Sequence, residues 1–281
     1  NISEEHLATI RDYTKRIAEA MHVRGLMNMQ YAIENDVVYV LEANPRASRT
    51  VPLVSKICNI QMVPIATEVI TMPLTGRPSP IPELEEKSYE YYGVKEAVLP
   101  FNMFPEVDPV LGPEMRSTGE VLGLAKTFGE AFFKAQEATQ TVLPKGGKVL
   151  ITVSNKDKDE LPELARALKD AGFDIYATEG SAELIEAEGI AVERVKKLHE
   201  GRPNLVDLIT NGEMDLVINT PAATGESAED DSYIRKTAIK AHTPYFTTMA
   251  AALASAKGIK TVETSEEGGI ASLQEIHAKI S

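Results

Sequence analysis

Residues 25–55 read GLMNMQYAIENDVVYVLEANPRASRTVPLVS, and this stretch decides how the first half of the chain is interpreted. Two strand-like runs, 26–33 and 37–43, flank Glu34-Asn35-Asp36, a pattern that predicts an antiparallel two-stranded ribbon. Amide and carboxylate oxygens suit a hard divalent cation, and guanidinium groups suit phosphate. Such groups occur on and just after the ribbon, at Gln30, Glu42, Asn44, Arg46 and Arg49. The stretch therefore predicts part of a site for a nucleoside triphosphate.

The register of the ribbon decides whether these polar groups meet. A three-residue turn places Asn28 opposite Glu42, with Gln30 as the diagonal neighbour on the same face. A two-residue Asn-Asp turn exchanges the faces and separates the polar groups. We predict the three-residue turn because it gathers them. Taken alone, Gln30, Glu42 and Asn44 could also form a solvent-exposed polar face of the hairpin that binds no ligand. The arginines that follow favour a binding site.

Length, charge and cysteine content limit the classes of protein to consider. The 281 residues suffice for two domains. A formal charge of −13 argues against a general nucleic-acid or membrane-surface role. The single cysteine, Cys58, excludes a Cys-rich zinc site and lies in an apolar run that predicts a buried thiol. The apolar runs are shorter than the ~20 residues of a membrane span, and no signal peptide opens the chain, so we expect a cytoplasmic protein.

The remaining first half mixes helices, one strand and a long loop. Ser3 is a candidate N-cap for a helix that runs to about Met21. The loop at 101–120 is dense in Pro, Gly and Asp. The other elements that we predict are helices near 52–70 and 128–139, a Pro-rich break at 73–82 and a strand at 96–101. Pro144-Lys145-Gly146-Gly147 reads as a linker, so we place one domain at 1–145 and a second at 146–281.

The second half alternates strands and helices regularly. The predicted strands are 148–153, 173–177, 191–195, 215–219 and 245–247, and the helices between them indicate a compact, doubly wound parallel α/β sheet. Ligands bind such sheets beyond the carboxyl ends of the strands, where helix N-termini present free N–H groups. Hydroxyls, amides and lysines there predict a phosphate site at Thr152, Lys158, Thr178, Ser181, Lys197, Asn219 and Thr220. Helix capping remains the alternative for residues 178–181.

Two long motifs resemble a known enzyme family. LEANPRASRTVPLVSK (41–56) and VLPFNMFPEVDPVLGPEMRSTGEVLG (98–123) closely resemble the large subunit of carbamoyl phosphate synthetase. HEGRP (199–203), INT (218–220) and the strand–helix repeat resemble its regulatory domain, which has a methylglyoxal-synthase-like fold. The resemblance runs from end to end and covers roughly the last quarter of that subunit. We therefore expect Asn1 to be a truncation point.

The resemblance implies that residues 1–145 are the end of the second, carbamate-phosphorylating ATP-grasp half. The family is an ATP-dependent, glutamine-hydrolysing ligase that makes carbamoyl phosphate from bicarbonate and glutamine-derived ammonia for pyrimidine and arginine synthesis. Gln30, Glu42 and Asn44 match ligands of the metal, Mg²⁺ or Mn²⁺ with ATP, and K⁺ is a further candidate. Arg46 and Arg49 match residues near the transferred phosphoryl group. The resemblance puts the remaining ATP-grasp residues upstream, so we expect this chain to be inactive alone.

The resemblance also implies effector sites. The seven phosphate-site residues match positions where bacterial members bind UMP, an inhibitor, or IMP, an activator. Glu96, Leu99, Tyr245 and Thr247 match part of an ornithine site at the junction of the two domains, although the last two could simply be strand residues. Two departures weaken the nucleotide expectation: Pro221 replaces a hydroxyl, and AATGESAEDD, with its acidic run at 226–231, replaces arginines. Implied partners are the rest of the large subunit, the glutaminase small subunit and further copies of the chain.

Two other functions stay open. A methylglyoxal-synthase-type lyase needs a carboxylate base and a histidine acid at the rim of the sheet. The region INTPAATGE lacks the aspartate-proline and proline-histidine pairs of such enzymes, and we interpret His199 as a loop histidine. The last alternative is a non-catalytic oligomerisation or nucleotide-sensing module.

Overall fold

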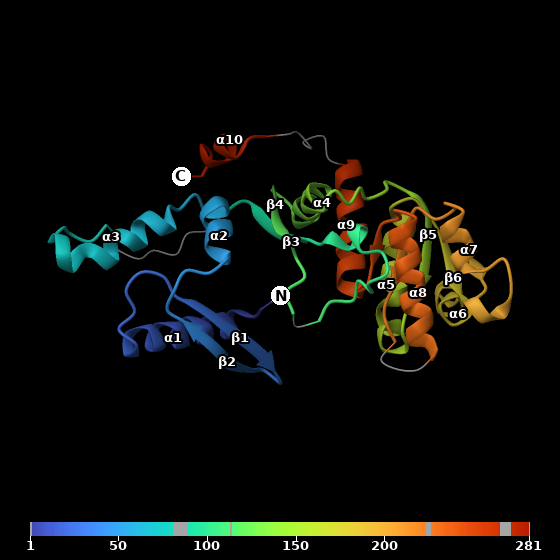
Figure 1. Cartoon of the computed structure of the whole chain (residues 1–281), viewed down its shortest axis with the longest axis horizontal. Helices are drawn as coiled ribbons and strands as arrows, with labels where there is room; N and C mark the ends of the chain where they lie inside the picture. Colours follow the sequence, from blue (N-terminus) through green and yellow to red (C-terminus); the bar gives the residue numbers. More distant parts are fainter. Residues whose placement is uncertain (1, 81–88, 113, 223–225, 265–270, 281) are drawn as a thin grey trace. The chain divides into compact units, whose positions relative to one another are not determined.

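The computed structural model describes residues 2–80, 89–112, 114–222, 226–264 and 271–280. The chain forms two compact units, Asn1–Tyr89 with Ala271–Ser281, and Glu90–Ile270, which are described separately here (Figure 1). The boundary that we predict at 145 and 146 lies inside the second unit. The segment before it therefore packs with the five-stranded sheet that follows.

The first unit is a two-stranded ribbon with helices. Ser3 caps α1 (Glu4–Ala20) as predicted, because its hydroxyl accepts a hydrogen bond from the His6 amide at 3.2 Å. Thr14 of α1 is 2.6 Å from the Tyr31 hydroxyl on the ribbon. The other elements are β1 (Asn28–Glu34), β2 (Val37–Asn44), α2 (Thr50–Cys58), α3 (Met62–Thr75) and α10 (Leu273–His277). The predicted helix at 52–70 is thus two helices, separated where Asn59 adopts a left-handed conformation.

Two further findings concern α2 and α3. Cys58, for which we predict burial, is only half-buried at the end of α2. Among the described residues no single helix is both long and apolar enough to span a membrane. The sharply bent pair α2–α3 meets the criteria of length and composition only when its helices are combined.

The ribbon corrects the predicted turn and explains how the polar groups still meet. Glu34 pairs with Val37, so the turn is the two-residue Asn35-Asp36, in which both residues have positive φ. Further along, Tyr31 pairs with Val40 whereas Gln30 pairs with Glu42, which leaves Leu41 as an extra residue in a β-bulge. The three-residue turn is therefore wrong. The bulge supplies the one-residue shift instead, and it places Gln30 directly opposite Glu42.

The second unit begins with an antiparallel pair and a helix. β3 (Tyr92–Val98) pairs with β4 (Gly119–Ala125), and α4 (Phe128–Ala138) packs on both strands. The strand that we expect at 96–101 begins earlier and ends at Val98, where the 3₁₀ turn Pro100–Met103 follows. Helix α4 also packs on α9 (Met249–Thr264), which covers the five-stranded sheet, and residues before 145 therefore belong to this unit.

The remainder of the unit is the predicted doubly wound sheet. Five parallel strands lie in the order β7-β6-β5-β8-β9. The chain fills one side of β5 before it crosses to β8, so the switch point lies between β5 and β8. The strands are β5 (Gly147–Thr152), β6 (Phe173–Thr178), β7 (Val192–Val195), β8 (Leu216–Asn219) and β9 (Tyr245–Phe246). The helices are α5 (Leu161–Asp170), α6 (Glu179–Ala187), α7 (Leu205–Thr210), α8 (Glu226–Lys240) and α9 (Met249–Thr264).

Both faces of this sheet are covered, which explains its nearly continuous apolar strands. On β5, Val149 and Ile151 join the core formed with α5, α6 and α9, while Leu150 joins the core formed with α7 and α8. All three side chains are fully buried. The carboxyl ends of the strands are thereby held on a rigid base.

Candidate functional site

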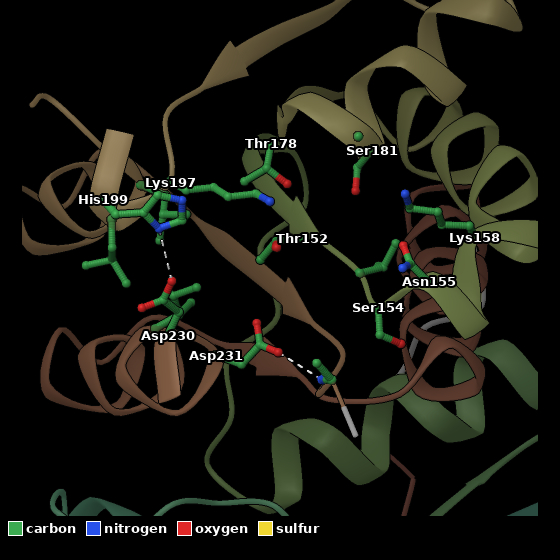
Figure 2. A pocket seen from close by; sticks show the side chains of 16 residues that line it. Thr152, Ser154, Asn155, Lys158, Thr178, Ser181, Lys197, His199, Asp230 and Asp231 are labelled. Carbon is green, nitrogen blue, oxygen red and sulfur yellow. Dashed lines mark hydrogen bonds and ion pairs between the residues drawn. The ribbon is translucent and has the colours of Figure 1, made fainter. Parts of the chain in front are cut away.

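A cavity of about 230 Å³ lies at the carboxyl ends of β5 and β6. It brings together five of the seven residues predicted to bind phosphate: Thr152, Lys158, Thr178, Ser181 and Lys197. Figure 2 shows Lys158 and Lys197 extending into the cavity from opposite sides, with the hydroxyl residues between them. Two cations and several hydroxyls around one space suit a phosphate group.

Each of these groups is placed by the local fold. Thr152 ends β5, and the 3₁₀ segment Asn155–Glu160 that follows brings Lys158 to the rim. Thr178 precedes α6, whose first turn contains Ser181. Within the described residues the Thr178 hydroxyl forms no hydrogen bond that caps α6, so capping does not account for it. A Cβ at Gly180 would stand 3.2 Å from the Lys158 ammonium, so the glycine leaves that lysine room above the helix N-terminus.

The other two predicted residues, Asn219 and Thr220, lie behind the lining that the described residues form. Both are almost completely buried. The Thr220 hydroxyl accepts a hydrogen bond from the Ser154 amide at 2.8 Å, which holds the segment after β5. Asn219 uses its side-chain amide to join Asp231 and Arg235. These residues shape the wall of the cavity from inside the protein.

The acidic run is arranged differently from the sequence expectation. Asp231 accepts hydrogen bonds from the Asn219 amide at 2.8 Å and the Ala222 main-chain N–H at 2.9 Å, so both carboxylate oxygens face protein donors. Asp230 lies 3.5 Å from His199 (Figure 2). Both aspartates and His199 line the cavity. Residues 223–225, which precede this run in the loop AATGESAEDD, lie outside the described residues.

Sequence reasoning missed Ser154 and Asn155, and it interpreted His199, which also lines the cavity, as a loop histidine. Ser154 and Asn155 lie two and three residues beyond the end of β5, a position that could have identified them. Asp230 and Asp231, which also line the cavity, belong to the acidic run that replaces arginines in the resemblance, and nothing in the sequence indicated the donors that Asp231 meets.

A second cavity, of about 480 Å³, contains all four residues matched to an ornithine site: Glu96, Leu99, Tyr245 and Thr247. Its lining comes from β3, the following loop, α4 and the β9 region. Burial raises the pKa of Glu96, against a smaller lowering by the Ala97 main chain. Burial and the nearby charge of Asp108 raise the pKa of Tyr245 to about 12. A half-buried carboxylate in a cavity lined by both polar and apolar side chains suits a ligand that carries an ammonium group.

The ribbon of the first unit presents the predicted metal ligands on one face. Gln30 is opposite Glu42, and the Asn44 amide donates a hydrogen bond to the Glu42 carboxylate. Arg46 and Arg49 are exposed just beyond β2. In the described part of the chain, no group of three or more His, Cys, Asp and Glu could hold a metal ion. One carboxylate with two amide oxygens still fits Mg²⁺, which takes few protein ligands and completes its shell with phosphate and water.

Comparison with known proteins identifies the family. The family model described as "Carbamoyl-phosphate synthase L chain, ATP binding domain" matches residues 1–72, and that described as "MGS-like domain" matches residues 160–247. A carbamoyl phosphate synthase large chain from Methanosarcina barkeri is 43% identical over 280 residues, which cover all of this chain and 69% of that protein. The chain belongs to the carbamoyl phosphate synthase large-chain family.

Other relatives show which part of the large chain this is. The "Carbamoyl phosphate synthase large chain, C-terminal section" of Aquifex aeolicus is 43% identical over 99% of this chain and 55% of that protein. The large chain of Ralstonia nicotianae is 44% identical over the whole chain, which spans only 26% of its length. A solved structure of methylglyoxal synthase from Elizabethkingia anophelis is 21% identical in sequence and has a TM-score of 0.34. The match covers 44% of this chain and 81% of the synthase chain, and this similarity is too weak to support an argument.

As a C-terminal section of a carbamoyl phosphate synthase large chain, the protein contains an ATP-binding segment and an MGS-like domain. The ATP-binding match includes the ribbon with Gln30 and Glu42. The MGS-like match includes the part of the cavity at the carboxyl ends of β5 and β6 that α6, Lys197 and the acidic run form.

Proposed function

We propose that the second unit of this carbamoyl phosphate synthase section senses a nucleoside monophosphate, UMP or IMP, and ornithine. The observation that carries the proposal is the placement of Lys158 and Lys197 on opposite sides of a cavity lined by hydroxyls at the N-terminus of α6. A phosphate there gains two cations, hydroxyl donors and the free N–H groups of the helix. Asp231 lines the cavity, but both of its carboxylate oxygens accept hydrogen bonds from protein donors, which weakens its repulsion of a phosphate.

In the first unit, we propose that Gln30, Glu42 and Asn44 hold Mg²⁺ or Mn²⁺ and that Arg46 and Arg49 neutralise the transferred phosphoryl group. Phosphoryl transfer depends mainly on positioning and charge neutralisation, and a metal ion held by these residues would supply charge neutralisation. The reaction is the phosphorylation of carbamate made from bicarbonate and glutamine-derived ammonia. The reaction proceeds in the cytoplasm and requires the rest of the large subunit and the glutaminase small subunit. The complete protein forms assemblies of several copies. Its product serves pyrimidine and arginine synthesis. We propose that this chain alone does not complete the reaction.

Calorimetric titration with UMP, IMP and ornithine tests the proposed sensing function. We expect binding of at least one nucleotide and of ornithine. Uridine and inosine, which lack the phosphate, are matched control ligands. We expect them to bind at least tenfold more weakly, which corresponds to a loss of about 1.4 kcal/mol of binding free energy. Equal binding of nucleoside and nucleotide would contradict a phosphate site between the two lysines.

The affinity for ornithine should depend on the ionisation of Glu96. Burial raises the pKa of this carboxyl, so the anion that attracts an ammonium forms at a higher pH than in an exposed glutamate. We therefore expect the affinity to fall as the pH is lowered through this raised pKa, beginning above the ordinary range of glutamate. Glu96→Gln should weaken ornithine binding by about 10- to 100-fold, because it removes a hydrogen bond to a charged group that contributes about 1.5–3 kcal/mol. The substitution should also remove this pH dependence. Titration calorimetry at several pH values measures both effects.

Glu120→Gln is the matched control for Glu96→Gln. Glu120 lies on the partner strand, opposite Ala97, and pairs with Lys95 at 2.9 Å outside the cavity lining. The substitution removes the same charge from the same strand pair. If it weakened ornithine binding as much as Glu96→Gln, the effect would come from net charge and not from a contact with the ligand.

One observation favours a second candidate function, that of a methylglyoxal-synthase-type lyase. His199 and Asp230 form a histidine–carboxylate pair, 3.5 Å apart, in the lining of the phosphate cavity. Such a pair can move a proton next to a carbonyl. Release of methylglyoxal from dihydroxyacetone phosphate, abolished by Asp230→Asn, would make the cavity catalytic, whereas binding of UMP without turnover supports sensing.

A further inference from the structure

Helix α1 is joined to the ribbon beside its bulge by a small group of hydrogen bonds. The Tyr31 hydroxyl lies 2.6 Å from the Thr14 hydroxyl, which in turn donates to the Ile10 carbonyl oxygen at 2.7 Å. The Tyr31 hydroxyl is also 3.4 Å from that carbonyl oxygen. All three contacts are partly buried, so they are stronger than the same contacts would be in water. One strand residue is therefore held to one turn of the helix.

The same face of α1 also reaches the turn of the ribbon. His6, Ile10 and Thr14 follow one another at intervals of four residues, so their side chains share one face of the helix. The Nε2 atom of His6 donates to the Asp36 carbonyl oxygen at 3.3 Å. Helix α1 also packs on β2 (Figure 1). The helix thus holds the ribbon at two points, the turn and Tyr31.

Tyr31 is the strand residue at which the register changes. It pairs with Val40, whereas the adjacent residue Gln30 pairs with Glu42. A bulge disrupts the ladder of main-chain hydrogen bonds and bends the strand. Main-chain pairing therefore fixes the ribbon less firmly here than along a regular ladder. The side-chain contacts between Tyr31 and α1 hold the strand at the place where the ladder is weakest.

Loss of the bulge would separate the proposed metal ligands. If the pairing of Tyr31 with Val40 continued without the extra residue, Gln30 would face Leu41, and Glu42 would face Met29. Met29 lies on the same side of the strand as Tyr31, so the Glu42 carboxylate would move to the face opposite Gln30. The contact of Tyr31 with α1 also keeps Gln30 directed away from the helix, because neighbouring side chains of a strand point to opposite faces.

We propose that Thr14 and Tyr31 are positioning residues for the metal, through which helix α1 holds the bulge in place and keeps Gln30 and Glu42 directed at one ion. The inference rests on the proposed function, in which Gln30, Glu42 and Asn44 hold Mg²⁺ or Mn²⁺. The two hydroxyls lie on the ribbon face opposite Gln30, so they act through the ribbon and not by contact with the ion. Loss of residues that orient metal ligands typically weakens metal binding by about 10- to 100-fold.

The test is a titration of the 281-residue chain with Mn²⁺, in which the electron paramagnetic resonance signal of free Mn²⁺ measures binding. We expect Tyr31→Phe, which removes only the hydroxyl, to raise the dissociation constant for Mn²⁺ by about tenfold. Its melting temperature should fall by only about 4–8 °C, as for one lost hydrogen bond in a unit of this size. The titration is made well below that temperature. A purely structural role would lower the melting temperature and leave the Mn²⁺ affinity of the folded chain unchanged.

Tyr39→Phe is the matched control for Tyr31→Phe. Tyr39 lies on the partner strand of the same ribbon, and its side chain is exposed. The substitution removes the same hydroxyl from the same sheet. We expect it to leave the Mn²⁺ affinity within about twofold, as is usual for a change at the surface.

Substitutions at Thr14 test the other side of the contact and provide the evidence if Tyr31→Phe does not fold. Thr14→Val should reproduce the loss of Mn²⁺ affinity, whereas Thr14→Ser, which keeps the hydroxyl, should not. Thr9→Val is the matched control. The Thr9 hydroxyl donates to the Glu5 carbonyl oxygen at 3.0 Å, which is the bond that Thr14 makes within the same helix. Thr9→Val should therefore leave the affinity within about twofold.

Glu42→Gln separates the positioning role from the proposed function. If the unmodified chain does not bind Mn²⁺, or Glu42→Gln binds it equally well, the proposed metal site is overturned and the positioning role with it. If Glu42→Gln weakens binding but Tyr31→Phe and Thr14→Val do not, the positioning role alone is overturned. Loss of affinity in Tyr31→Phe and Thr14→Val, with none in their two controls, supports the proposal.

Discussion

Lys197→Ala and Lys158→Ala are each expected to raise the dissociation constant for UMP by about 10- to 100-fold. Each substitution removes a charged donor from one side of the phosphate cavity. A hydrogen bond to a charged group contributes about 1.5–3 kcal/mol, and each 1.4 kcal/mol is about a factor of ten in affinity. Titration calorimetry at constant ionic strength measures the change, since salt screens such contacts.

Two neighbouring lysines provide controls of equal charge. Lys196 precedes Lys197, Lys156 lies in the same 3₁₀ segment as Lys158, and both are exposed and outside the cavity lining. Lys196→Ala and Lys156→Ala should leave the affinity for UMP within about twofold, because exposed charges that do not contact the ligand are largely screened by salt. If UMP bound both Lys197→Ala and Lys158→Ala with unchanged affinity, the nucleotide would bind outside this cavity.

The second half of the fold was predictable because local and global signals agree there. The central strands β5 and β8 of the five-stranded sheet are largely apolar, since residues such as Leu150 and Ile151 are buried on opposite faces. Short turns then fix the alternation of strand and helix. The residues at strand ends, Thr152 and Thr178, follow from the topology alone, and the structure brings both into one cavity.

The first half was harder because its decisive features are departures from regular patterns. A single bulge at Leu41, which no sequence rule located, sets the register that gathers Gln30 and Glu42. Strand β4 was missed as a partner of β3, since GEVLGLA contains two glycines that obscure its alternation. From the sequence, the acidic run was expected to repel a phosphate. The two groups that donate hydrogen bonds to Asp231, the Asn219 side chain and the Ala222 main-chain N–H, become its neighbours only in the folded chain.

Gly123→Ala is expected to lower the stability of the second unit by about 3 kcal/mol, at the upper end of the usual cost of overpacking. A Cβ at this position of β4 would lie 1.9 Å from the Ala131 carbonyl oxygen and 2.6 Å from the Ala135 nitrogen. These are main-chain atoms of α4, so no side-chain rotation can relieve the overlap. The melting temperature should fall by roughly 6–12 °C for a unit of this size, as measured by circular dichroism or calorimetry.

Displacement of α4 should also reach the second cavity, because Phe132 and Gln136 of this helix line it. We therefore expect Gly123→Ala to weaken ornithine binding while the affinity for UMP, whose cavity α4 does not line, changes less. Gly119→Ala is the control on the same strand: its added Cβ would lie 3.7 Å from Val98 side-chain atoms, an ordinary contact. Equal melting temperatures for the two variants would mean that α4 does not rest on β4 as closely as the structure places it.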